Sequence, residues 1–148
     1  MKEPLNPIVD RSSSIRQIGS KTGEPWGLIG IAEVHILRGE LEKALPILKE
    51  IEKITKNVEE KLTVAYVNYL WGKFYAAEGN KERAMESLRL SIKIYEDIGM
   101  RDNHYHKTLY EFGKISGIRE LLYRALEFFE RIGNQFWVKR IREEMDLI

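Results

Sequence analysis

Two of the three histidines, His104 and His106, are close enough in sequence to suggest a shared metal site. They lie two positions apart in a segment with helical periodicity. Because a helix turns by about 100° per residue, their side chains would point about 200° apart and would not converge on one metal ion. The pair therefore predicts no metal site.

Motifs for nucleophilic or phosphate chemistry are also missing from the sequence. The chain has no cysteine, which excludes a disulfide framework, a thiolate metal site and a cysteine nucleophile. Neither GxxxxGK[ST] nor GxGxxG occurs. The serine run at 12–14 has no base nearby in sequence, and the carboxylates alternate with Lys and Arg as on solvated helix faces. We therefore expect no catalytic residue, no metal, no cofactor and no enzymatic activity.

The charge balance disfavours nucleic acid as a partner. The 148 residues include 24 basic and 23 acidic side chains, with a formal net charge of +1, whereas a phosphate-binding protein normally shows a basic excess. No apolar run approaches the roughly 18 residues that span a bilayer. The N-terminus lacks the apolar core of a signal peptide. The sequence thus predicts a soluble cytoplasmic protein with no membrane and no nucleic-acid partner, and its charged, cysteine-free composition resembles that of thermophile proteins.

A repeated combination of large and small residues is the strongest structural signal. The small member of each of three pairs precedes an alanine by twelve positions: Trp71-Gly72 before Ala84, Phe112-Gly113 before Ala125, and Ile31-Ala32 before Ala44. This spacing is typical of a helix–turn–helix unit in which two helices touch at their small residues. Repetition of such a unit indicates a helical solenoid, which usually offers a binding surface rather than chemistry.

Apolar residues recur three or four positions apart along most of the chain, which predicts amphipathic helices joined by short turns and no strands. The predicted helices cover about 25–36, 40–54, 58–78, 81–97, 102–116, 119–131 and 134–148. Acid-first pairs four positions apart should stabilise several of them: Glu52–Lys56, Glu120–Arg124 and Glu127–Arg131.

The predicted organisation is a flexible arm over 1–14 followed by a single domain over 15–148. A short helix holding Ile15 and Ile18 would open the domain, and Gly19 would end it. The repeats are expected at about 25–58, 65–98 and 106–132, and a final amphipathic helix over 134–148 would cap the last repeat.

These features resemble the tetratricopeptide repeat (TPR), in an extended form of about 40 residues. The resemblance covers about 25–132 and is clearest in repeat two, through Trp71-Gly72 and the turn Gly79-Asn80 before Ala84. The alanine-to-alanine spacings of 40 and 41 exceed the usual 34. Repeat three also departs from the pattern, because Glu120 stands where the turn glycine is expected.

The resemblance implies an all-α fold, a right-handed α-α superhelix of about three stacked antiparallel helix pairs plus a C-terminal capping helix. In repeat one, Ala32 rather than Gly30 keeps the register of small positions. His35 falls where the family often has a packing aromatic residue, so we expect it to pack against its neighbours. Trp71 and Phe112 are expected in the core.

In TPR proteins the first helix of each pair builds the inner, concave wall. Carried over residue by residue, the resemblance places three site residues of each repeat there: Trp26, Ile29 and Glu33; Tyr66, Tyr69 and Lys73; Lys107, Tyr110 and Lys114. Aromatic rings beside a few charges suit the binding of an extended or helical peptide. For Trp26 and Tyr69, packing against a neighbouring helix is an equal alternative. The family's clamp for C-terminal carboxylates is absent, since only Lys107 would fit it.

The predicted function is a non-enzymatic protein–protein interaction scaffold that binds a peptide or helix on its concave wall. One alternative is a self-associating unit, a homo-oligomer formed through apolar residues at the N-terminal end of the array, among them Leu28 and Ile31. Another is the sensor fragment of a transcriptional regulator or signalling ATPase. The identity of the partner is not encoded in these patterns.

Overall fold

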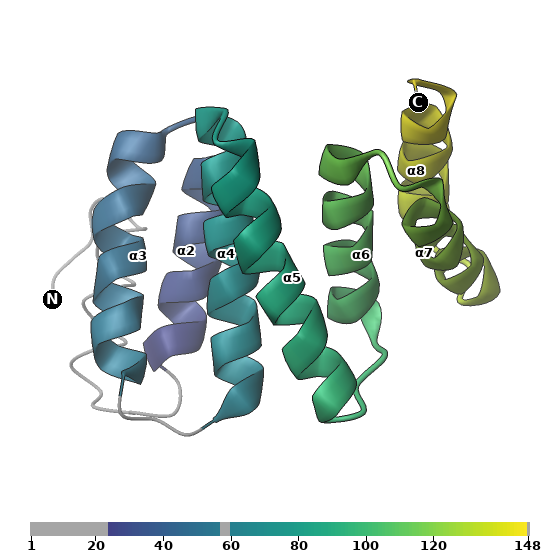
Figure 1. The fold of residues 1–148 in the computed structure, drawn as a ribbon. Helices are drawn as coiled ribbons and strands as arrows, with labels where there is room; N and C mark the ends of the chain where they lie inside the picture. The colour runs from purple at the N-terminus through teal and green to yellow at the C-terminus, as the bar shows by residue number, and fades with distance from the viewer. Residues whose placement is uncertain (1–23, 57–59, 148) are drawn as a thin grey trace, which may run out of the picture.

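The computed structural model describes residues 24–56 and 60–147. Every regular element in these two stretches is a helix (Figure 1). The helices are α2 (Glu24–Leu37), α3 (Leu41–Thr55), α4 (Lys61–Glu78), α5 (Lys81–Asp97), α6 (Asn103–Ser116), α7 (Arg119–Arg131) and α8 (Gln135–Leu147). The predicted arm, the short helix with Ile15 and Ile18, and residue 58 lie outside the described residues.

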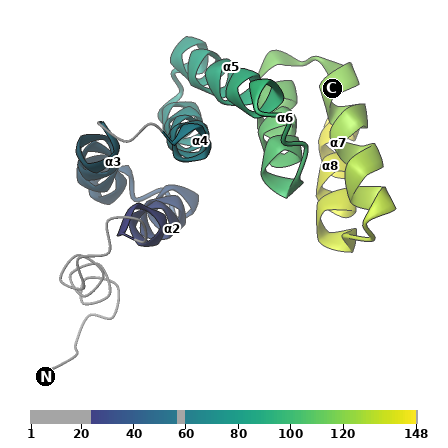
Figure 2. The ribbon, with the colours of Figure 1, turned by 90° about the horizontal axis from the view of Figure 1, so that it is seen from below.

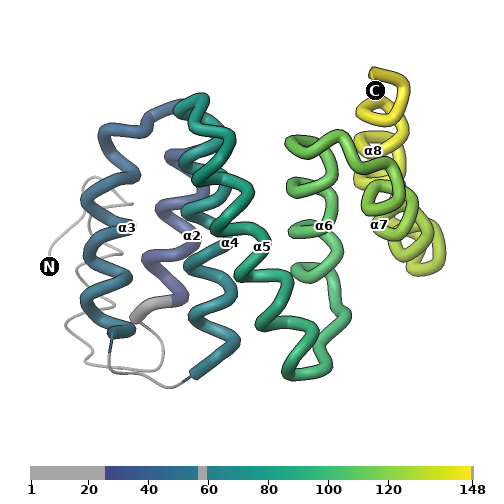
Figure 3. Tube along the Cα trace, in the orientation of Figure 1, coloured from purple at the N-terminus to yellow at the C-terminus, as the bar shows by residue number. Residues whose placement is uncertain are grey.

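Consecutive helices pack as antiparallel pairs, α2 with α3, α4 with α5 and α6 with α7, and α8 covers α7. Figure 3 shows the chain reversing direction at each turn between described helices. Viewed nearly end-on in Figure 2, α2, α4, α6 and α8 lie on the inner side of an arc, and α3, α5 and α7 lie on its outer side. The protein is therefore an all-α superhelix of stacked helix pairs with a C-terminal helix over the last pair, as predicted.

The turns follow from local sequence. Gly79 ends α4 in the left-handed region, at φ 86°, which a glycine adopts without steric cost. The Asn80 side chain then accepts a hydrogen bond from the Arg83 backbone N–H and caps α5. In repeat three, Gly117 ends α6 and Ile118 leads into α7 with no side-chain cap. Glu120 lies inside the first turn of α7, because α6 ends at Ser116, three residues after Gly113, whereas α4 ends at Glu78, six residues after Gly72.

The paired helices touch at their small residues, as the twelve-residue spacing predicted. Ala32, Ala44, Ala84 and Ala125 are fully buried. A Cβ at Gly72 would lie 2.5 Å from Leu88 Cγ. A Cβ at Gly30 would meet nothing within 4 Å. Ala32 rather than Gly30 therefore keeps the register, and the prediction is confirmed.

The core consists of three contacting groups of buried side chains. The first extends from α2 to α6 and contains Trp71 and Phe112, which confirms their predicted burial. The second joins α6, α7 and α8 and contains Phe129. The third links α4, α5 and α6 through Tyr95 and Tyr105. Within 24–56 and 60–147, none of the helices combines the length and the apolar character that a bilayer span needs.

Two sequence-based expectations about side chains are wrong. Among the described residues, none of the predicted pairs Glu52–Lys56, Glu120–Arg124 and Glu127–Arg131 forms an ion pair. Leu28, expected to be exposed at the N-terminal end, is fully buried in the first core group. The exposed apolar side chains of α2 include Val34 and Leu37 instead, which changes the residues on which self-association would depend.

Candidate functional site

A chain of aromatic rings crosses three inner helices. Trp26 of α2 meets Tyr66 of α4 edge to face, with ring centroids 4.7 Å apart. Tyr66 in turn meets His104 of α6 at 4.2 Å. Trp26 remains 37% exposed, and the other two rings are half-buried. We call Trp26, Tyr66 and His104 the aromatic band, because it is a continuous, partly exposed strip across the inner wall.

His104 belongs to this band although sequence analysis considered it only as a metal ligand. The spacing of His104 could have indicated that it lies on the inner wall. His104 is three positions before the predicted wall residue Lys107, so the two side chains share one face of the helix. The contact with Tyr66 could not be deduced from that spacing. It depends on how closely α4 approaches α6.

Charged side chains continue the wall beyond the aromatic band. Lys73 of α4 forms an ion pair with Glu33 of α2, with Nζ 3.5 Å from Oε2. Lys114 pairs with Glu111 on α6 at 3.3 Å. These two pairs neutralise four of the charges on the wall, so its middle section presents paired rather than free charges.

Lys107 is the predicted wall cation that no carboxylate pairs with among the described residues. Its Nζ lies 5.5 Å from the ring centroid of Trp137 in α8. The Arg140 guanidinium lies 5.7 Å from the same ring. The C-terminal helix thus adds an aromatic ring and a cation to the wall, a role that sequence analysis did not assign to α8.

Three predicted site residues are buried and do not offer an exposed contact surface. Ile29 is 6% exposed, Tyr69 4% and Tyr110 2%. Burial raises the pKa of the Tyr69 hydroxyl, and the nearby carboxylates of Glu111 and Glu33 raise it further. Burial likewise raises the pKa of Tyr110. The two buried tyrosines lie beneath two of the predicted wall cations, since Lys73 Nζ is 5.4 Å from the ring centroid of Tyr69 and Lys114 Nζ is 5.2 Å from that of Tyr110.

The histidines pack against different elements. His35 is buried and its Nδ1–H donates a hydrogen bond to Glu40 at 2.8 Å, which holds the pKa of that carboxyl below its usual value. His35 therefore packs as predicted. His106 stacks on Phe128 of α7, with ring centroids 3.9 Å apart, whereas His104 faces Tyr66. No group of three or more His, Asp and Glu side chains is placed to hold a metal ion in the described part of the chain.

Burial lowers the pKa of both His104 and His106 below the ordinary value of 6.5. The positive charge of Lys107 also lowers the pKa of His104. Arg124 and Arg131 lower that of His106, against a hydrogen bond to the Asp102 carbonyl. Both rings are accordingly uncharged at neutral pH, so the aromatic band is an apolar rather than a cationic surface.

These lowered pKa values predict a loss of stability in mild acid. The folded-state pKa of His106 lies below its unfolded value, so the unfolded chain binds more protons once the pH falls below about 6.5. The free energy of unfolding should therefore decrease between about pH 7.5 and pH 5.5. Urea unfolding measured by circular dichroism should show a shallower pH dependence for His106→Gln. Equal slopes for the variant and the parent protein would contradict this prediction.

No model of a known protein family matches this sequence, and no curated protein matches it. The functional proposal therefore depends on the fold and on the contacts of the inner wall.

Proposed function

We propose that this protein is a non-enzymatic, TPR-like scaffold of the cytoplasm that binds a peptide or a helix of a protein partner on its inner wall. The observation that supports this proposal best is the aromatic band. Trp26, Tyr66 and His104 come from three different helices and form one partly exposed strip. Partly exposed aromatic rings provide large contact area at low entropic cost, as in known protein interfaces.

The charges beside the aromatic band fit a polypeptide ligand. Glu33 and Lys73 bridge α2 and α4, so both hydrogen-bond donors and acceptors lie next to the rings. Lys107 adds a cation without a carboxylate partner on the far side of the band. An apolar strip flanked by both signs of charge suits an amphipathic segment, whose apolar side chains would cover the rings.

The proposal is tested by changing exposed wall residues without disturbing the core. Trp26→Ala combined with Lys107→Glu removes one ring of the band and reverses one free charge. We expect affinity capture from the source cell, followed by mass spectrometry, to lose the partner of the parent protein. In titration with that partner, the affinity should fall at least about tenfold, because an aromatic anchor contributes 2 kcal/mol or more in typical interfaces.

A matched control also replaces one aromatic residue by alanine and one lysine by glutamate, but on outer helices. Tyr123→Ala on α7 and Lys43→Glu on α3 change exposed side chains far from the inner wall. This control should retain the partner, and both variants should keep the circular dichroism spectrum of the parent protein. Retained capture by the Trp26/Lys107 variant would exclude the inner wall as the binding surface.

A further inference from the structure

One side of α2 presents apolar and small residues without any charge. Gly30, Val34 and Leu37 are exposed, Val34 by 39% and Leu37 by 64%, and Gly27 is half-buried. Their spacing of three, four and three positions places all four along one face of the helix. We call Gly27, Gly30, Val34 and Leu37 the α2 stripe.

The polar side chains of α2 that the structure describes are engaged elsewhere. Glu33 pairs with Lys73 of α4, and His35 bonds to Glu40. The exposed positions of α3, α5, α7 and α8, in contrast, include several Lys, Arg, Asp or Glu side chains each. A surface helix normally places polar residues on the side away from the core. An exposed helix face of Val, Leu and Gly therefore indicates a contact surface.

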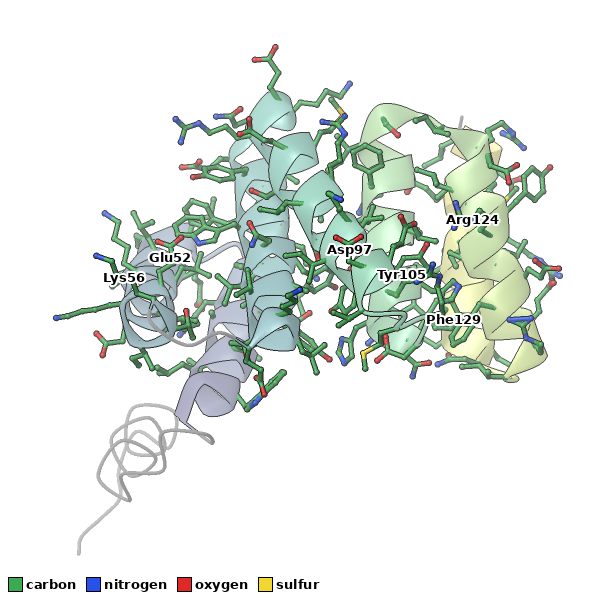
Figure 4. All side chains as sticks on the ribbon, turned by 60° about the horizontal axis from the view of Figure 1, so that its bottom comes forward. Glu52, Lys56, Asp97, Tyr105, Arg124 and Phe129 are labelled. Atoms are coloured by element: carbon green, nitrogen blue, oxygen red, sulfur yellow. The ribbon has the colours of Figure 1, made fainter. Side chains whose placement is uncertain are left out.

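The α2 stripe belongs to the first helix of the described array. Among the described helices, α2 packs against α3 and α4. Figure 4 shows it at one end of the arc, with α7 and α8 beside the labelled Phe129 at the other end. The exposed positions of α8 include Lys139, Arg142 and Glu143, so that end has a polar cover. The two ends of the described array therefore differ in chemistry.

Gly30 has no close-packing role within the described chain. A Cβ at Gly30 would meet nothing within 4 Å, whereas a Cβ at Gly72 would collide with Leu88. A glycine inside a helix destabilises it relative to alanine, because the glycine backbone loses more conformational freedom on folding. The missing side chain at position 30 would instead permit another helix to approach α2 closely.

The order of small and large residues in the α2 stripe is complementary to itself. The two glycines come first and the two large residues last, and the spacing is symmetric about the level of Ala32. An antiparallel second α2 centred there would place Leu37 of each copy at the level of Gly27 of the other, and Val34 at the level of Gly30. Large side chains would thus face small ones in both directions, as close packing between helices requires.

We propose that the occupant of the α2 stripe is a second copy of this chain, held by an antiparallel α2–α2 contact about a twofold axis. Such an interface uses the same patch on both copies, so self-complementarity is its basic requirement. This contact is distinct from partner binding on the inner wall, although Trp26 borders both surfaces. Because a monomeric chain could still capture a partner on the inner wall, the two proposals fail independently.

The expected dimer is reversible. Each copy offers one helix of 14 residues, fewer than the roughly 20–30 residues per side of a standard interface. We therefore expect a dissociation constant of roughly 10–100 µM, weaker than that of a permanent dimer.

Sedimentation equilibrium of the whole chain tests the proposal between about 5 and 500 µM, a range that brackets this dissociation constant. The parent protein should change from monomer to dimer. Val34→Glu with Leu37→Glu should stay monomeric, because dimerisation would bury two unpaired carboxylates in each copy. The matched control, Leu90→Glu with Leu147→Glu, changes two leucines that are 47% and 80% exposed on α5 and α8, and it should dimerise like the parent. All three proteins should share one circular dichroism spectrum.

Disulfide trapping tests the antiparallel geometry. The chain has no cysteine, so Gly30→Cys and Val34→Cys each introduce a single thiol. When equal amounts of the two variants are mixed and oxidised, the mixed disulfide should exceed both homodimers together, as judged by intact mass.

Three results would overturn the proposal. A parent protein that stays monomeric over the whole concentration range would leave residues 1–23 of this chain, or a different protein, as the occupant of the stripe. An undiminished dimer of the Val34/Leu37 variant would place the interface elsewhere. Homodimeric disulfides that equal or exceed the mixed one would exclude the antiparallel pairing.

Discussion

Replacing Gly72 by valine is expected to destabilise the protein by about 3 kcal/mol, the upper part of the range for overpacked cores. Any Cβ at this position would lie 2.5 Å from Leu88 Cγ and 2.6 Å from Leu88 Cδ2. Leu88 is fully buried in the first core group and cannot swing into solvent. The two helices α4 and α5 would therefore have to separate around Gly72 and Leu88.

Urea unfolding followed by circular dichroism measures this effect. Gly30→Val is the matched control, because Gly30 also lies inside a helix but a Cβ there meets nothing within 4 Å. We expect the control to change the unfolding free energy by about 0.5 kcal/mol or less, as helix propensities of glycine and valine differ little. Similar unfolding midpoints for the two variants would show that the small residue at 72 is not required for the α4–α5 contact.

Phe129→Ala is expected to cost about 4 kcal/mol, in the range measured for large-to-small changes at aromatic core positions. Phe129 is fully buried, and its ring stacks on Trp137 with centroids 5.4 Å apart. Its removal would leave a cavity between α7 and α8. Since each unit of a repeat array contacts mainly its neighbours, we expect the damage to be concentrated in the C-terminal half.

Hydrogen exchange followed by mass spectrometry can locate this damage. In Phe129→Ala, amides of α7 and α8 should lose protection, while those of α2 and α3 should exchange as in the parent protein. Phe136→Ala serves as the control, because Phe136 is adjacent to Trp137 in sequence but 65% exposed. Equal loss of protection in all helices would indicate that the protein unfolds as one cooperative unit.

The helical units could be predicted from the sequence because their signals are local. The spacing of Gly72 from Ala84 and the turn at Gly79 each depend on a few neighbouring residues. Because a helix has a fixed period, the spacing of residues along it determines which of them share one face. The predicted turn after α4 and the small-residue contact between α4 and α5 are both present. Steric size alone explains the contact, since a glycine and an alanine permit two helices to approach closely.

The composition of the binding surface depended on contacts between residues distant in sequence. Tyr66 and Tyr69 lie on the same side of α4 by spacing, yet one is half-buried in the aromatic band and the other is 4% exposed in the core. Lys107 lies over the ring of Trp137 in α8, and Arg124 donates a hydrogen bond to the hydroxyl of Tyr105 instead of pairing with Glu120. Periodicity defines a helix face, but the angle and distance of the next helix decide which part of that face is covered. Local patterns therefore specified the repeats, whereas the packing of helices from different repeats selected the side chains that remain available to a partner.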